Sequence, residues 1–299
     1  MENIIEIKDK RYPKLLKETK GAPKKLYYKG NWNDIFSAQG GPASGRENCL
    51  AVVGSRHLTS YGRRMTELLV SEIAARGITI VSGFMYGGDE AAHQAAVEAG
   101  GRTIAVMPCG IDVIHPEYQA ELYHKILKSK GLIISEFEGN FPPADWTYPR
   151  RNRIVAGLSK AVLIVEAGLN SGTMITAGYA KKFGRKIFAV PGPLTSEVSK
   201  GTARLIKEGA EIVTEAGDVL KYFNLGNLGT KFLSNTKELS SLKMDGLERK
   251  IMDNLKREPL ETDALARLLK IPVSKISANL SLMQIKGFIK QEGNKYFID

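Results

Sequence analysis

Cysteine is scarce in this chain, which has two, Cys49 and Cys109, among 299 residues. Neither lies in a Cys-x-x-Cys motif, so neither a disulfide framework nor a zinc site is expected. Long apolar runs are also missing, and the longest, such as residues 161–165, are much too short to span a membrane. The first 25 residues are rich in charge and lack the apolar segment of a signal peptide. These absences favour a cytoplasmic protein with no metal centre.

Basic residues outnumber acidic ones, with 43 Lys and Arg against 32 Asp and Glu and a formal net charge of +11. Such an excess is typical of a protein that binds a polyanion, although a soluble basic protein without that partner can have the same composition. Residues 244–299 contain ten basic and eight acidic side chains, so +2 of the +11 lies there and +9 in residues 1–243. A polyanion would therefore meet mainly the first 243 residues.

Short apolar runs alternate with segments of helical period between residues 50 and 213. The runs expected to be buried strands are 50–53, 78–81, 103–107, 132–134, 161–165 and 186–190. The segments expected to be helices are 61–75, 89–99, 117–128, 150–158 and 172–183, and 202–213 adds a last helix and strand. This alternation predicts an α/β domain with a doubly wound, mostly parallel sheet.

The composition divides the chain into four parts. We expect residues 1–49 to be a lead-in packed on the core, with a loop at 39–46, and residues 50–224 to be the α/β domain. Residues 225–243 lack any period and have the composition of a linker. Residues 244–299 then return to a helical pattern and form a second, smaller domain.

The second domain has the pattern of a winged helix-turn-helix. Helices are expected at 247–255, at 262–269 with Thr262 as its N-cap, and at 274–285. An alternating stretch around Gly293-Asn294 predicts a hairpin after them. Three helices followed by a hairpin are the elements of that fold.

Glycine and polar residues follow the strands at the sheet edge where ligands bind in such domains. Gly54, Ser55 and Arg56 come after the first strand and are followed by Thr59, while Gly83 opens a glycine-rich loop after the second. Glycine lets a phosphate approach the backbone, serine offers a hydroxyl, and arginine offers a planar charged fork. Alone, Gly-Ser-Arg also fits a turn with a surface arginine.

An aromatic and arginine-rich segment follows the fourth strand. Trp146 and Tyr148 precede Arg151, Asn152 and Arg153 at the start of a helix. A ring can stack on a base while guanidinium groups bind phosphates, which favours a nucleic-acid site. The alternative is a basic helix end packed under the tryptophan.

A helix start follows the fifth strand, at Ser171, Gly172 and Thr173. Its hydroxyls and free N–H groups suit a phosphate. Several such places along one sheet edge predict an extended ligand with more than one phosphate.

Asp89 and His93 lie one helical turn apart after the second strand. They could act as a general base or bind a metal, but no third ligand is visible in the sequence. We therefore expect a structural pair in which Asp89 caps the helix and contacts His93.

In this order, the motifs resemble those of the DprA/Smf (DNA-processing protein A) family over residues 50–212. The resemblance is carried by Gly54-Ser55-Arg56 with Thr59, Tyr61 and Gly62, by Ser82-Gly83 with Asp89 and His93, by Ser135-Glu136, by Arg151-Asn152-Arg153 with Gly157-Leu158-Ser159, by Ser171-Gly172-Thr173 with Thr176 and Ala177, by Gly184-Arg185, and by Pro191-Gly192. Residues 263–296 also resemble the winged-helix module often attached to that family.

The chain departs from the family pattern in three places. The loop after the second strand contains the bulky residues Phe84 and Met85. His115-Pro116 stands where the family usually has Tyr-Pro, and Tyr148-Pro149 where it usually has Phe-Pro. These changes alter the shape of the expected pocket and keep aromatic rings beside the prolines.

The resemblance implies an extended Rossmann-like fold, a homodimer, and a basic pocket that binds single-stranded DNA without cofactor or catalysis. It implies protection of incoming DNA and interaction with a RecA-type recombinase, which such proteins help to load during natural transformation and recombination. By motif position, Arg56 and residues 171–173 would hold phosphates and Tyr148 would stack on a base, with Arg151 and Arg153 nearby. Lys182, at the end of the helix after that loop, is a further candidate for DNA contact.

Two other classes of function stay open. Phosphoribohydrolases of the Lonely Guy family have a similar fold, but their Pro-Gly-Gly-x-Gly-Thr loop is replaced here by Pro191-Gly192-Pro193, and motifs of phosphate-loop, zinc-protease and serine-hydrolase enzymes are missing. A ligand-sensing regulator would read duplex DNA with the helix 274–285, which has one cation, Lys275. A protein-binding role suits that helix as well.

Overall fold

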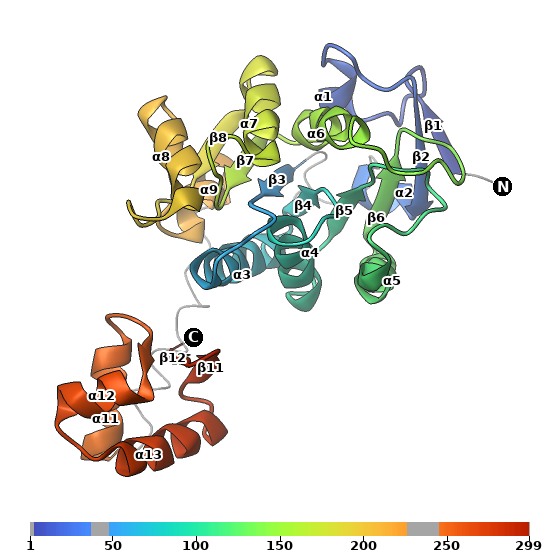
Figure 1. Cartoon of the computed structure of the whole chain (residues 1–299). Helices are drawn as coiled ribbons and strands as arrows, with labels where there is room; N and C mark the ends of the chain where they lie inside the picture. The colour runs from blue at the N-terminus through green and yellow to red at the C-terminus, as the bar shows by residue number, and fades with distance from the viewer. Residues whose placement is uncertain (1–2, 37–47, 226–244, 299) are drawn as a thin grey trace. The chain divides into compact units, whose positions relative to one another are not determined.

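A nine-stranded sheet runs through the first of two structural units, residues 1–228, and the second unit spans residues 229–299 (Figure 1). The computed structural model describes residues 3–36, 48–225 and 245–298. The strands of the first unit are β1 (Asn3–Glu6), β2 (Lys25–Gly30), β3 (Cys49–Val53), β4 (Thr79–Ser82), β5 (Thr103–Val106), β6 (Leu132–Ser135), β7 (Ala161–Ile164), β8 (Lys186–Ala189) and β9 (Glu211–Ile212).

The strand order is β1-β2-β6-β5-β4-β3-β7-β8-β9. Every pair from β6 to β9 is parallel, whereas β2 pairs antiparallel with β6 and β1 pairs antiparallel with β2. The inner strands are apolar along their whole length because helices cover both faces of the sheet, as in β3, whose five residues are all buried. This architecture confirms the predicted α/β, doubly wound, mostly parallel sheet.

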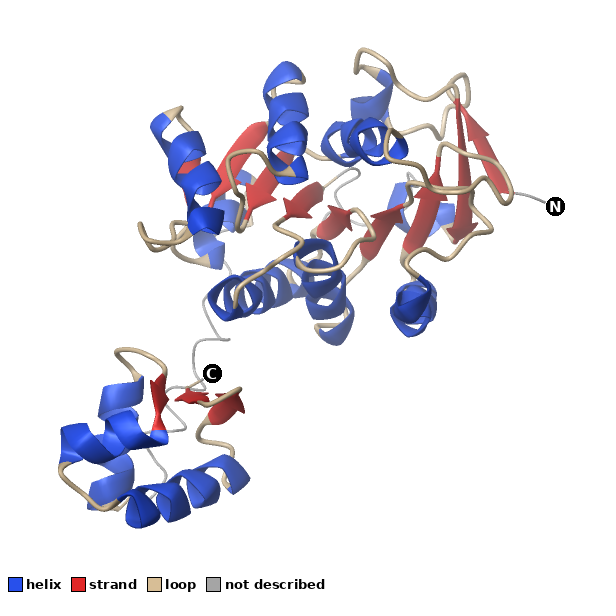
Figure 2. Ribbon diagram, viewed as in Figure 1, coloured by secondary structure: helices blue, strands red, loops and turns tan. Residues whose placement is uncertain are grey.

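Two layers of helices cover the sheet (Figure 2). One layer contains α3 (Ser60–Ala75), α4 (Gly88–Glu98), α5 (Ala120–Lys128) and α9 (Ala216–Tyr222), in which α3 contacts α4 and α9, and α4 contacts α5. The other contains α1 (Lys14–Lys17), α6 (Thr147–Leu158), α7 (Gly172–Lys182) and α8 (Lys200–Lys207), in which α6 contacts α1 and α7. Short helices complete the unit: α2 (Trp32–Phe36) and the 3-10 turns η1 (Glu117–Gln119) and η2 (Glu197–Ser199).

Each expected strand of the α/β domain is present within one or two residues of its predicted bounds. The helix expected at 150–158 begins earlier, at Thr147, and the one expected at 117–128 divides into η1 and α5. Residues 3–36 do more than pack on the core, because β1 and β2 extend the sheet at one edge. The loop expected at 39–46 lies outside the described residues.

The second unit contains three helices and a small sheet. Its elements are α11 (Gly246–Leu255), β10 (Leu260–Glu261), α12 (Thr262–Leu269), α13 (Val273–Ile285), β11 (Lys290–Glu292) and β12 (Lys295–Phe297). The strands form a sheet in the order β10-β12-β11, and the helices enclose a separate core that includes Ile251, Leu265 and Leu280. The predicted winged helix is confirmed.

The N-caps of two helices in the second unit were not predicted from the sequence. Glu261, not Thr262, occupies the N-cap position of α12, because β10 runs directly into the helix. Asp245 caps α11 in a reciprocal capping box with Glu248. The expected linker, residues 225–243, lies outside the described residues apart from Leu225. Across the described helices of both units, none is long and apolar enough to cross a lipid bilayer.

Candidate functional site

A cavity of about 720 Å³ opens at the carboxyl ends of β3, β4 and β7. From β3, the sheet grows to one side through β4, β5 and β6 and to the other side through β7, β8 and β9. The loops on either side of such a switch point diverge and leave a crevice in which ligands bind. The topology therefore explains why the cavity forms at this place in the sheet.

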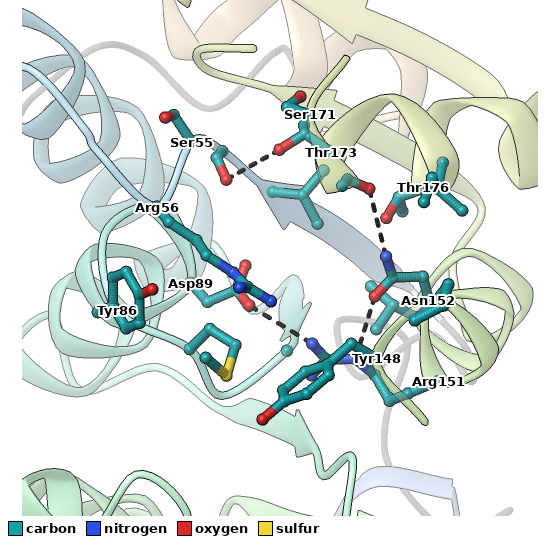
Figure 3. A pocket seen from close by; sticks show the side chains of 18 of the residues that line it. Ser55, Arg56, Tyr86, Asp89, Tyr148, Arg151, Asn152, Ser171, Thr173 and Thr176 are labelled. Carbon is teal, nitrogen blue, oxygen red and sulfur yellow. Dashed lines mark hydrogen bonds and ion pairs between the residues drawn. The ribbon is translucent and has the colours of Figure 1, made fainter. Parts of the chain in front are cut away.

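The loop after β3 contributes Ser55 and Arg56 to the cavity (Figure 3). Ser55 Oγ accepts a hydrogen bond from the backbone N–H of His57 at 3.0 Å, and the Ser55 carbonyl accepts one from the N–H of Gly88 at 3.0 Å. These bonds fix the turn and join it to the start of α4. The side chain of Arg56 is exposed and extends into the open space.

Aromatic rings surround the Arg56 guanidinium. Its central carbon lies 5.2 Å from the ring centre of Tyr148 and 5.7 Å from that of Tyr86, within the range of cation–π attraction. The Tyr148 hydroxyl and His115 Nε2 form a hydrogen bond of 2.9 Å. Burial lowers the pKa of His115 below its ordinary value, so the neutral form of this ring predominates at pH 7. One wall of the cavity is thus a cation held between two phenol rings.

Arg151 lies beneath the cavity and not in the open space that Arg56 occupies. Its side chain is 4% exposed, Nη1 donates to the carbonyl of Val106, and Nη2 lies 3.9 Å from the carboxylate of Asp89. Gly83 makes room for this pair, since a Cβ at that position would overlap both side chains. Arg151, expected near the bound strand, does line the cavity, but its charge faces a buried carboxylate and a carbonyl.

Asp89 and His93 do not form the expected pair. Asp89 accepts a hydrogen bond from Ser82 Oγ at 3.0 Å, and burial raises the pKa of its carboxyl. His93 points elsewhere, with Nδ1 2.7 Å from Thr103 Oγ1 and Nε2 bonded to the carbonyl of Gly83, and burial lowers its pKa to about 4. Nor is Asp89 the cap of α4, because the N-cap position belongs to a glycine. Within the described residues, no cluster of three or more potential metal ligands is present.

The first turn of α7 forms the wall opposite Tyr148 (Figure 3). Thr173 Oγ1 donates to the carbonyl of Gly54 at 2.9 Å, and Asn152 Nδ2 donates to the carbonyl of Gly172 at 3.3 Å. Ser171 occupies the N-cap position but makes no capping bond, and its buried Oγ has no hydrogen-bond partner among the described residues. Because buried hydroxyls are normally bonded, this one together with the free N–H groups of the turn can receive an anionic ligand.

Three predicted site residues do not line the cavity. Thr59 is the N-cap of α3, and its hydroxyl bonds to the buried carboxylate of Glu166. Arg153 bonds to Glu136, and Lys182 is exposed in the last turn of α7. The predicted residues that do line it are Gly54, Ser55, Arg56, Gly83, Tyr148, Arg151, Asn152, Ser171, Gly172 and Thr173.

The cavity is also lined by residues that the sequence motifs did not assign to it. They include Tyr86, Asp89, His115, Asp145 and Thr176. Tyr86 lies within the glycine-rich loop that Gly83 opens, and an aromatic ring beside Gly87 in such a loop could have been assigned to the site from the sequence. His115 and Asp145 reach the site through long loops, which sequence spacing does not place.

The cavity is less basic than expected, because acidic and basic side chains in its lining are equal in number. Two arginines, Arg56 and Arg151, and two aspartates, Asp89 and Asp145, line it. Since Arg151 faces Asp89, the cation available to a ligand in the cavity is Arg56. Neutral donors on α7 would then supply much of the binding to a phosphate.

The protein has a Rossmann-like domain with a cavity at the switch point of its sheet, followed by a winged helix-turn-helix domain. Residues 3–224 match the model of the family described as DNA recombination-mediator protein A, and residues 236–295 match the model of the DprA winged helix domain. The chain belongs to the DNA recombination-mediator protein A (DprA/Smf) family, as the sequence resemblance predicted.

Named relatives agree with this assignment. The chain is 36% identical to Protein Smf of Escherichia coli, covering 96% of this chain and 75% of that protein. It is 38% identical to the DNA processing protein DprA of Streptococcus pneumoniae, covering 73% of each.

Two solved structures are also similar. The crystal structure of DprA from Streptococcus pneumoniae aligns with a TM-score of 0.66 at 37% identity, covering 74% of each chain. DprA from Helicobacter pylori, whose single-stranded DNA binding mode has been described, aligns with a TM-score of 0.63 at 30% identity, covering 74% of this chain and 95% of that one.

Proposed function

We propose that the cavity binds single-stranded DNA. The observation that carries this proposal is the position of Arg56 between two tyrosine rings, across the cavity from the Ser171 hydroxyl, which has no partner in the part of the chain that the structure describes. A nucleotide needs a ring on which its base can stack and donors for its phosphate, and the two walls offer both. The relative from Helicobacter pylori, which binds single-stranded DNA, supports the same ligand.

Family membership supports the wider role. On this proposal, the protein protects incoming strands and helps to load a RecA-type recombinase during natural transformation and recombination. It acts in the cytoplasm as a homodimer and has no catalytic activity of its own. Light scattering tests the dimer directly, since a monomer of 32.8 kDa at micromolar concentration would contradict it.

Single strands should bind more tightly than duplexes. The bases of a duplex are stacked on one another and cannot reach a ring inside a cavity, whereas the bases of a single strand can. No side chain of the cavity needs to read a base edge, so sequence preference should be weak. Affinity should fall as salt rises, because phosphate binding releases counterions.

A filter-binding comparison tests the proposal. Labelled oligothymidylate and a duplex of equal length are titrated with the wild type, Tyr148→Ala and Tyr148→Phe. We expect the single strand to bind more tightly, Tyr148→Ala to lose about 1–3 kcal/mol of binding free energy, and Tyr148→Phe to retain most of it. Equal affinity for the duplex, or an alanine variant that binds like the wild type, would contradict the proposal.

The other two functions predict different results with the same protein. A phosphoribohydrolase would release free base from nucleoside monophosphates. Its expected loop, at Pro191-Gly192-Pro193, does not line the main cavity; Gly192 and Pro193 line a separate one of about 340 Å³. A duplex-reading regulator would bind duplexes more tightly and lose that binding when residues 244–299 are removed.

A further inference from the structure

Three aromatic rings gather on the loop between β6 and the start of α6. Phe137 and Phe141 are stacked with ring centres 4.7 Å apart, and Trp146 meets both edge-on at 5.7 and 6.0 Å. Arg150 lies 5.8 Å from the centres of both the Phe137 and Trp146 rings. We call Phe137, Phe141, Trp146 and Arg150 the loop cluster.

The loop cluster is open to solvent. Trp146 is 51% exposed and Phe141 is 38% exposed, whereas the other tryptophan of the chain, Trp32, is 2% exposed and packs in the core. Large rings left in water forgo the stabilisation that burial gives, so the needs of the fold do not explain this arrangement.

The loop cluster is also held rigidly. The carbonyls of Phe137 and Phe141 accept hydrogen bonds from the backbone of the loop after β5, at Ile111 (3.2 Å) and Gly110 (2.8 Å). The guanidinium of Arg150 makes two bonds to Glu136, at 2.9 and 3.1 Å, which keep it over the rings. A rigid surface loses little entropy when a ligand stacks on it.

The loop cluster adjoins the cavity along the chain. Asp145 and Pro149 line the cavity, and Trp146 lies between them at the N-cap of α6. Tyr148, the proposed stacking ring inside the cavity, is two residues further on. A strand that leaves the cavity on the side of Asp145 and Pro149 would thus have Trp146 beside its path.

We propose that the loop cluster is a second stacking platform, on which bases of a single DNA strand stack after the strand leaves the cavity. The proposal rests on the function proposed above and adds the direction in which the strand continues. Exposed aromatic side chains beside a guanidinium are the groups that bind single-stranded nucleic acid without reading its sequence. Continuity with the cavity favours DNA as the occupant over a protein segment, which would need the rings but not the cavity.

Tryptophan fluorescence offers a direct test because the chain has two tryptophans and one of them is buried. The full chain is titrated with an oligothymidylate of about 20 nucleotides and with one of about 4, which is short enough to fill the cavity alone. We expect the long strand to quench the emission and the short strand to do so much less. Trp146→Phe should bind the long strand with little change and lose the quenching.

Affinity measurements complete the test. Trp146→Ala should weaken binding of the long strand about fivefold or more and leave the short strand within about twofold. Leu68→Ala removes a side chain of similar exposure, 54%, from α3 and should change neither.

The outcomes separate the two proposals. If the wild type binds no single strand at all, the proposed function fails. If it binds tightly while the long strand leaves the tryptophan emission unchanged and Trp146→Ala binds like the wild type, the strand does not cross the loop cluster. In that case the platform is wrong, the cavity stands, and the rings are left for a protein partner.

Discussion

Arg56 and Arg151 contribute the same guanidinium group to one cavity and differ in what surrounds it. Arg56 is exposed and has rings beside it, whereas Arg151 is buried against Asp89 and a backbone carbonyl. An exposed guanidinium can bind a ligand. A buried guanidinium is already paired, and breaking that pair leaves an uncompensated charge in the interior, which destabilises the fold. The two residues should therefore respond in opposite ways to the same substitution.

We expect Arg56→Ala to lower single-strand affinity about tenfold or more while changing the free energy of unfolding by less than about 0.5 kcal/mol. Arg151→Ala should lower the free energy of unfolding by about 3 kcal/mol or more, because it leaves the Asp89 carboxyl buried without its partner. Denaturant unfolding and filter binding on both variants check this. An Arg56→Ala protein that unfolds, or an Arg151→Ala protein of normal stability, would reverse the two roles.

His93 should make stability fall in acid. Burial lowers its pKa to about 4 from the ordinary 6.5. Between these two values His93 is protonated in the unfolded chain and neutral in the folded one. The free energy of unfolding is therefore unaffected by His93 above pH 6.5. It falls as the pH drops from 6.5 towards 4, by about 2 kcal/mol between pH 7 and pH 5. The raised pKa of Asp89 acts in the opposite sense, so the wild type alone is not diagnostic.

The variant His93→Gln isolates this effect. Its free energy of unfolding, measured in denaturant at pH 7 and pH 5, should fall less between the two values than that of the wild type. Equal losses in the two proteins would mean that His93 is not kept neutral in the folded state.

At the scale of elements, the inner strands could be predicted because both of their faces are buried. β3 and β7 are continuous apolar runs that polar loops bound on each side. β1 and β2 lie at the sheet edge, are partly exposed and mix charged with apolar residues, so their sequence does not distinguish them from an irregular lead-in. α6 begins three residues before the predicted bound, and Pro149 lies in its first turn, where proline is tolerated.

The candidate site was predictable to the extent that it follows from strand ends. Residues directly after β3, β4 and β7 had to meet at one edge of a parallel sheet, and they do. The burial of Arg151 was not predictable, because it depends on Gly83 leaving space for two side chains from distant segments. Sequence also could not show that Thr59 and Arg153 have carboxylate partners, Glu166 and Glu136.

The start of α4 at Gly88 packs directly on the backbone of Gly54 in the loop after β3, and this contact leaves no room for a side chain. A Cβ on Gly88 would lie 2.5 Å from the Cα of Gly54 and within 2.9 Å of its backbone N and C atoms. We expect Gly88→Ala to lower the free energy of unfolding by about 1–3 kcal/mol. Gly178→Ala is the matched control, because this exposed position in α7 has nothing within 4 Å and should gain up to about 1 kcal/mol.

Thermal or denaturant unfolding of the two glycine variants checks this prediction. If Gly88→Ala is as stable as the wild type, the α4 start can move away from the loop after β3, and the cavity is less rigid than the backbone contacts imply.

At the scale of the whole molecule, the two units have separate cores and unequal charge. The apolar clusters of the first unit use residues between Ile5 and Leu225, and that of the second uses residues between Leu247 and Ile298. The first unit, residues 1–228, has a formal net charge of +7, and the second, residues 229–299, has +4, which together give the +11 of the chain. Both the cavity and the loop cluster are built from the first unit.

Removal of residues 244–299 should therefore leave a folded protein that keeps most of its affinity for single strands. A unit with its own core does not need the other to fold, and the deleted part takes away a net charge of only +2. Circular dichroism and filter binding on the truncated chain check both halves of the expectation.

A folded truncation that binds single strands at least about tenfold more weakly, a loss of about 1.4 kcal/mol, would place a major part of the DNA contact on the winged helix. Loss of duplex binding alone, with single-strand affinity intact, would instead give the winged helix a separate ligand and leave the cavity as the site for single strands.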